Sequence, residues 1–130
     1  MGAWGMGNFE NDEAADWKWE LETSDDTAIL AQALRRICDS ETPPEAPDCC
    51  IALAAAEVIA ALNGKPMGDL PDEVKRYVAR IARGEDLTAD AIEAVRRIRV
   101  NSELKDLWEE SDGDEWAAIL DDLAARLNPK

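Results

Sequence analysis

The segment from Cys49 to Leu62 constrains the fold most, because its 14 consecutive residues are all apolar except Glu57. It is too short to cross a membrane, since a spanning helix needs about 20 apolar residues. A helix that is apolar nearly all round is normally buried in the middle of a domain. We therefore predict a central buried helix that Asp48 opens and Gly64 closes.

The two sides of this predicted helix differ in bulk. Small side chains occupy much of one side, which allows another backbone to come close. The glycine-rich first ten residues are the candidate for that contact, with Trp4 and Phe9 as their two large anchors. The bulky side carries Ile51, Ala55, Val58, Ile59 and Leu62, and the opposite side carries Cys50, Leu53, Ala54, Glu57 and Ala61.

The rest of the chain shows apolar residues at helical spacing and lacks the alternation of strands. Asn11 is the predicted N-cap of the first helix, with Asp12 in its first turn. The sequence therefore predicts one all-α domain over residues 1–130, with six or seven short helices and an irregular arm at 1–10 packed on them. The first two expected helices cover about 12–22 and 25–39, and Ser24 is the predicted cap of the second. Further helices are expected to begin at Pro71, after a cap at Thr88, after a break at Asn101-Ser102 and after a cap at Ser111.

The charge of the chain excludes several classes of function. Fourteen Lys and Arg stand against 29 Asp and Glu, for a net charge of −15. Binding to nucleic acid or to an anionic membrane surface needs the opposite sign. The absence of histidine removes Ser-His-Asp and Cys-His catalysis and histidine-ligated zinc. We expect no nucleic acid, no membrane and no cofactor.

Cysteine usage and the first residues indicate the compartment. Cys38, Cys49 and Cys50 are an odd number at a spacing that fits neither a redox motif nor a zinc site. We expect reduced, buried thiols. The segment 1–10 lacks the basic start and apolar stretch of a signal peptide. We expect a cytoplasmic protein.

Three blocks of the sequence carry a resemblance to a known family. In chain order they read GAWGMGNFENDEAADW, ALAAAEVIAALNG and SELKDLWEES. Together they resemble a bacterial family of small proteins, domain-of-unknown-function family 4259. Members of the family typically open Gly-Thr-Trp-Gly and continue to Phe-Glu-Asn-Asp, and Ala3 replaces the threonine here. The resemblance implies a cytoplasmic bacterial protein and carries no catalytic residue over.

Glu57 is the most informative single residue, because a carboxylate on an apolar helix needs water, a cation or hydrogen-bond donors. The first interpretation is structural: Glu57 accepts backbone N–H bonds from the Gly2–Gly7 arm and so holds Trp4 in place. A second is a carboxylate working in a cleft, and a third is an ordinary exposed glutamate.

The other candidate residues lie on the first predicted helix. Asp12, Asp16 and Glu20 recur every four residues, which is typical of a solvated face and less often of a Mg²⁺ or Ca²⁺ site. Trp19 points away from the apolar face of that helix, among acids. It lies either under the proline loop at 40–47 or at a binding hot spot.

Charge is also uneven along the chain. Residues 1–50 carry 12 acids and 3 bases, residues 51–100 carry 8 of each, and residues 101–130 carry 9 acids and 3 bases. The central arginines, at 76, 80, 83, 96, 97 and 99, are expected to pair with acids of the terminal helices.

These observations give two hypotheses for the function. The first is a non-enzymatic interaction protein, comparable to an inhibitor or immunity protein, whose acidic ends engage a basic partner or a second copy. The alternative is a carboxylate-based, possibly Mg²⁺- or Ca²⁺-dependent hydrolase that uses Glu57 or the Asp12/Asp16 face.

Overall fold

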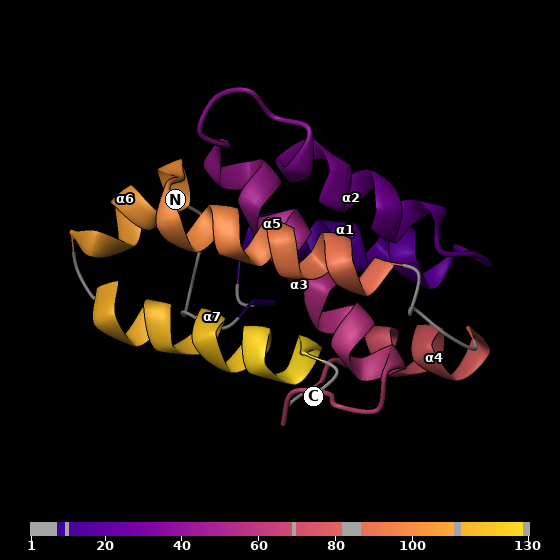
Figure 1. Ribbon diagram of the computed structural model, residues 1–130. Helices are drawn as coiled ribbons and strands as arrows, with labels where there is room; N and C mark the ends of the chain where they lie inside the picture. Colours follow the sequence, from indigo (N-terminus) through magenta and orange to yellow (C-terminus); the bar gives the residue numbers. More distant parts are fainter. Residues whose placement is uncertain (1–7, 10, 69, 82–86, 111–112, 129–130) are drawn as a thin grey trace.

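The apolar segment forms the centre of the fold. The structure is a computed structural model that describes residues 8–9, 11–68, 70–81, 87–110 and 113–128. In it the helix α3 (Ala46–Leu62) contacts each of the other six described helices (Figure 1). Every residue from Ala52 to Ala61 is buried, Glu57 included. The prediction of a central buried helix is confirmed.

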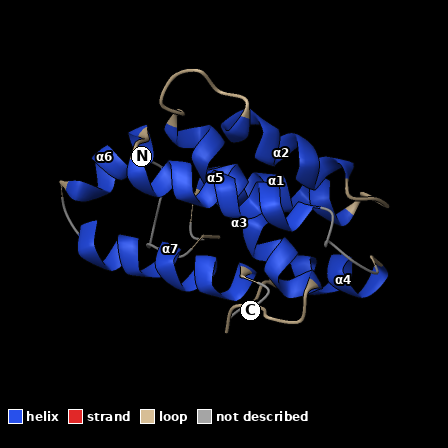
Figure 2. Cartoon of the chain, viewed as in Figure 1, coloured by secondary structure: helices blue, strands red, loops and turns tan. Residues whose placement is uncertain are grey.

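Six further helices surround α3, and together they form one all-α domain. The described residues contain seven helices and no strand (Figure 2). None of these helices has the length and apolar character that crossing a membrane requires. The surrounding helices are α1 (Asp12–Glu22), α2 (Ala28–Cys38), α4 (Asp72–Arg80), α5 (Thr88–Val100), α6 (Glu103–Glu109) and α7 (Gly113–Leu127).

The surrounding helices pack in two groups. On one side, α2 and α5 lie against each other and against α3, and α7 runs alongside α5 (Figure 1). On the other side, α1 packs on α4. The short α6 connects α5 to α7 and contacts both. As a result, α3 and α7 are brought together although three helices lie between them in the sequence. This contact positions the site described below.

The ends of the central helix follow from local chemistry. Pro47 lies in the first turn, where the missing N–H costs no hydrogen bond, so α3 begins at Ala46 and not at the predicted Asp48. After Leu62 the chain turns at Gly64, whose φ of 86° favours glycine. The N–H of Lys65 then donates to the carbonyl of Ala60 at 2.8 Å. The prediction that Gly64 closes this helix is confirmed.

The predicted start of the second helix was wrong by three residues. The hydroxyl of Ser24 donates to the Glu20 carbonyl at 2.8 Å, so Ser24 completes the end of α1 and does not cap α2. Asp26 instead accepts from the N–H of Ala28, at 3.0 Å, where α2 begins.

The remaining predicted boundaries fall close to the observed ones. The first helix covers 12–22, as predicted. Thr88 is the first residue of α5, while Leu87 holds the capping position assigned to it. The break at 101–102 is confirmed: Ser102 accepts from the Lys105 N–H at 3.0 Å and donates to the Ile98 carbonyl at 2.7 Å. The expected cap at Ser111 lies outside the described residues.

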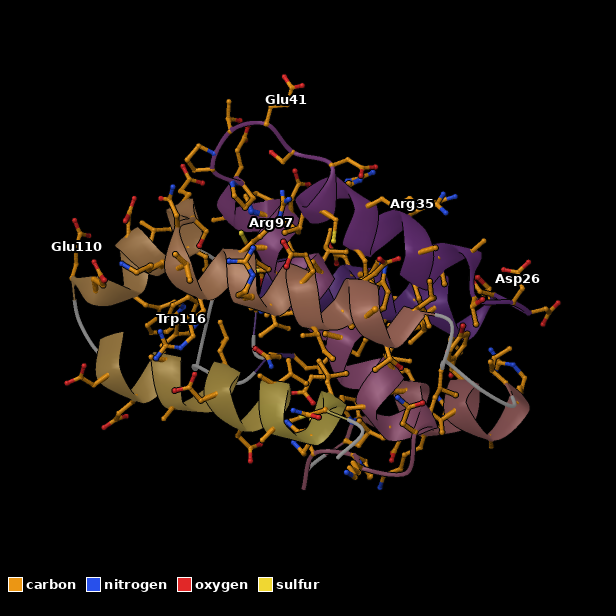
Figure 3. All side chains as sticks on the ribbon, in the orientation of Figure 1. Asp26, Arg35, Glu41, Arg97, Glu110 and Trp116 are labelled. Atoms are coloured by element: carbon orange, nitrogen blue, oxygen red, sulfur yellow. The ribbon has the colours of Figure 1, made fainter. Side chains whose placement is uncertain are left out.

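The large aromatic side chains divide between core and surface. Trp17 and Trp116 are buried, and Trp116 points from α7 toward α5 and α6 (Figure 3). Trp108 is half-buried, because it lies on the short α6 at the edge of the domain. The labelled Asp26, Glu41 and Glu110 point outward in the same view. The exposed shell is therefore strongly acidic.

Burial sets the ionisation of three core groups. All three cysteines are free, and burial raises the pKa of Cys49 from 9.0 to about 12 and that of Cys50 to about 11. Burial also raises the pKa of Tyr77 from 10.0 to about 12, with a smaller contribution from Asp26. The hydroxyl of Tyr77 donates to the carbonyl of Asp26 at 2.7 Å. The fold therefore favours the neutral form of each group.

We expect the protein to lose stability at alkaline pH for this reason. The folded pKa values lie above the unfolded ones, so these groups stabilise the fold fully below about pH 9 and progressively less up to about pH 12. Urea unfolding at pH 8, 10 and 11 measures the effect. The slope against pH should be shallower in Cys49→Ala than in the wild type, and equal slopes would refute the contribution of that thiol.

Candidate functional site

Glu57 lies at the most buried part of α3 and forms the first candidate site. It is 1% exposed, and its neighbours along the helix are alanines and aliphatic residues. An isolated carboxylate at such a position would be strongly destabilising. The surroundings of Glu57 must therefore supply both donors and positive charge.

Arg126 supplies the charge from the last turn of α7. Its Nη1 donates to Oε1 of Glu57 at 2.8 Å, and its Nη2 donates to Oε2 at 3.1 Å. This two-bond pairing is the strongest geometry available to an arginine and a carboxylate. It ties the central helix to the C-terminal one across 69 residues of sequence.

Asn8 completes the cluster from the residues before α1. Its side-chain Nδ2 donates to Oε2 of Glu57 at 2.7 Å, and Asn8 is itself only 3% exposed. Both carboxylate oxygens thus have partners. Among the described residues, no buried side-chain nitrogen or oxygen lacks a hydrogen bond. We call Asn8, Glu57 and Arg126 the buried cluster.

Arg126 is held in turn by its own neighbours. Its Nε donates to Oδ2 of Asp122 at 2.8 Å, and Nη1 also donates to the carbonyl of Lys65 at 3.3 Å. Burial lowers the pKa of Arg126, but the hydrogen bonds and charges of Glu57 and then Asp122 outweigh this, so the net direction is upward. The guanidinium is a fixed cation.

The structure describes part of the predicted contact between Glu57 and the arm. Trp4 and the Gly2–Gly7 segment lie outside the described residues. Asn8 approaches Glu57 with its side-chain amide, where the prediction invoked backbone N–H groups. The prediction missed Arg126, which it did not consider as a partner.

The other residues predicted near the start of α1 belong to the core or to the first turn of the helix. Phe9 is buried in the core. Asn11 caps α1, since its Oδ1 accepts from the N–H of Ala14 at 2.8 Å. Asp12 lies exposed in the first turn, where its negative charge faces the positive end of the helix.

The outer face of α1 is the second candidate site. The inner face of α1 is defined by its three buried residues, Ala14, Trp17 and Leu21. Trp19 is 67% exposed, so it does not lie under the proline loop. We call the exposed residues Asp12, Asp16, Trp19 and Glu20 the α1 outer face.

The arginines of α4 leave this face unneutralised. Arg76 pairs with Glu22 at the far end of α1, and Nη2 of Arg80 donates to the Glu22 carbonyl at 2.7 Å. Arg99 of α5 likewise pairs with Asp121 of α7, so the predicted pairing with terminal helices is confirmed for two arginines. Among the described residues, no ion pair reaches the three carboxylates of the α1 outer face.

Neither candidate site brings together a set of metal ligands. Within the described ranges, no group of three Asp, Glu or Cys side chains is placed to hold a metal ion. The Asp12, Asp16 and Glu20 carboxylates all face solvent. Glu57 already has both oxygens occupied by Arg126 and Asn8.

Comparison with known proteins gives one match. A family model described as Domain of unknown function (DUF4259) matches residues 2–118. Asn8, Glu57 and the α1 outer face lie inside the matched segment, and Arg126 lies beyond it. No curated protein matches the chain, and no solved structure does.

Proposed function

The chain belongs to the family Domain of unknown function (DUF4259), and from its surface we propose that it is a non-enzymatic protein-interaction module that engages a basic partner. The observation that carries the proposal is Trp19, 67% exposed on the α1 outer face. Bacterial inhibitor and immunity proteins offer a functional analogy for such a module.

Trp19 supplies the binding energy in this proposal. Exposed tryptophans are rare, and at interfaces they dominate the free energy of binding because they bury a large apolar area. The indole face also attracts cations, which a basic partner presents as lysine and arginine side chains.

The carboxylates around Trp19 determine which surfaces the protein attracts and how fast it encounters them. Asp12, Asp16 and Glu20 are exposed, and the chain as a whole carries a net charge of −15. A field of this sign accelerates encounter with a cationic surface and disfavours an anionic one. The proposed binding is therefore expected to weaken steeply with added salt.

Replacing Trp19 by alanine is expected to weaken binding of the basic partner by about thirtyfold or more, the loss typical of a hot spot. The immobilised wild type should retain one or more basic proteins at low salt, and Trp19→Ala should not. Titration of the retained protein against both variants then gives the ratio of Kd values.

The matched control is Val100→Ala, which removes another large exposed side chain, 58% exposed, from α5. It should leave binding unchanged. If Trp19→Ala retains the same proteins with the same affinity as the wild type, the proposal is wrong. If the wild type sediments as a dimer and Trp19→Ala as a monomer, the partner is a second copy and not a basic protein.

A further inference from the structure

A cavity of about 510 Å³ lies where the ends of three helices meet, away from the α1 outer face. The segment after α3, the first turns of α5 and the last residues of α7 line it. This volume lies within the usual range for sites that take small molecules. The described lining residues are Asn63, Lys65, Thr88, Ala89, Ile92, Arg126, Leu127 and Asn128.

The described lining of this cavity differs in charge from the protein as a whole. Asp and Glu make up 29 of the 130 residues, yet none of the described lining residues is acidic. By contrast, the cavity between α6 and α7 has Glu109, Asp114 and Glu115 beside its cations. The 510 Å³ cavity is therefore a concave surface of this acidic protein that suits an anion.

Lys65 provides the charge that is free to act on a ligand. Arg126 also lines the cavity, but the carboxylates of Glu57 and Asp122 more than balance its charge. Its hydrogen bonds to these two residues and to the Lys65 carbonyl use four of its five N–H groups. One N–H of Arg126 remains. Lys65 has no ion pair among the described residues and is exposed.

The rest of the lining is apolar or already hydrogen-bonded. The accessible aliphatic side chains of the lining are Ala89 and Ile92, because Leu127 is 1% exposed. The Nδ2 of Asn63 donates to the hydroxyl of Thr88 at 2.9 Å, which fixes one edge. A ligand that uses the whole cavity must combine one anionic group with an aliphatic body.

We propose that this cavity binds a small monocarboxylate with a short aliphatic chain. The carboxylate would lie at Lys65 and the remaining N–H of Arg126, and the chain would lie on Ala89 and Ile92. This inference concerns a different surface from the proposed protein interaction, and each stands without the other.

Hexanoate is the probe that tests this inference. Titrated into ¹⁵N-labelled protein, hexanoate should shift the amide signals of Lys65, Thr88 and Ala89 in a saturable way. Lys65→Gln should weaken hexanoate binding about tenfold, the loss expected for a hydrogen bond to a charged group. Ala89→Phe, at an exposed lining position, should abolish binding by filling the cavity.

Three controls make the result decisive. Lys75→Gln removes an exposed lysine outside the cavity and should bind hexanoate like the wild type. Hexanol, which lacks the charge, and inorganic phosphate, which lacks the aliphatic chain, should each bind at least tenfold more weakly than hexanoate. Hexanoate shifts that do not saturate, or that persist unchanged in both Lys65→Gln and Ala89→Phe, would overturn the inference. Equal binding of phosphate or hexanol would overturn the assigned ligand class.

Discussion

Arg126→Ala is expected to lower the free energy of unfolding by about 3–5 kcal/mol, because it leaves Glu57 charged and buried without its cation. Glu57 is 1% exposed, so its carboxylate depends on the guanidinium of Arg126 for a compensating charge. Asn8 would remain as a donor to Oε2, but an amide carries no charge. Urea unfolding followed by circular dichroism measures the change.

The control for this variant is Arg99→Ala, which breaks an arginine–carboxylate pair at the surface. Asp121, the partner of Arg99, is 59% exposed, and the loss should stay below about 1 kcal/mol. A loss for Arg126→Ala as small as that for Arg99→Ala would show that the buried cluster does not stabilise the fold.

A double variant separates the ion pair from simple loss of packing. Glu57→Gln removes the buried charge, so Glu57→Gln/Arg126→Ala should lose clearly less stability than the two single changes added together. Additive losses would mean that Arg126 acts through its aliphatic stem and not through Glu57.

Ile59→Ala is expected to cost about 3–4 kcal/mol, because it opens a cavity at the centre of the domain. Ile59 is fully buried on α3, the helix that contacts all the others. Ile51→Ala makes the same chemical change on the same helix at a half-buried position. Its cost should be about half as large or less. Equal costs for the two variants would contradict the central place of the Ala52–Ala61 segment.

The sequence predicted the fold well where the signal is local. A helix that is apolar nearly all round is normally buried, so α3 was placed at the centre although Glu57 interrupts its apolar segment. Asn11 and Gly64 mark helix ends through their own side-chain and backbone chemistry, and both are found at those ends. The start of α2 was misplaced because Ser24 can cap one helix or close another, and only the neighbouring carbonyl of Glu20 decides between them.

The sequence predicted the candidate sites only in part. The amphipathic pattern of α1 indicated that Trp19 points outward, and the structure leaves it exposed. The apolar surroundings of Glu57 implied that it has partners, and the prediction named the backbone of the arm. The described partners are instead the side chains of Asn8 and Arg126. Arg126 resembles any other arginine near the end of a helix, and it is 69 residues away in the chain.

Local pattern and composition determined which residues form helices, which helix is central and that the surface is acidic, since these depend on side chains within a few turns of each other. The tertiary structure decided the pairing of Glu57 with Arg126, the absence of ion pairs at the three carboxylates of the α1 outer face, and the described cavity lining without acids beside Lys65. Each of these depends on how segments distant in the sequence are placed relative to one another. The packing of α7 and α4 against the rest of the domain sets that placement, and local preference does not.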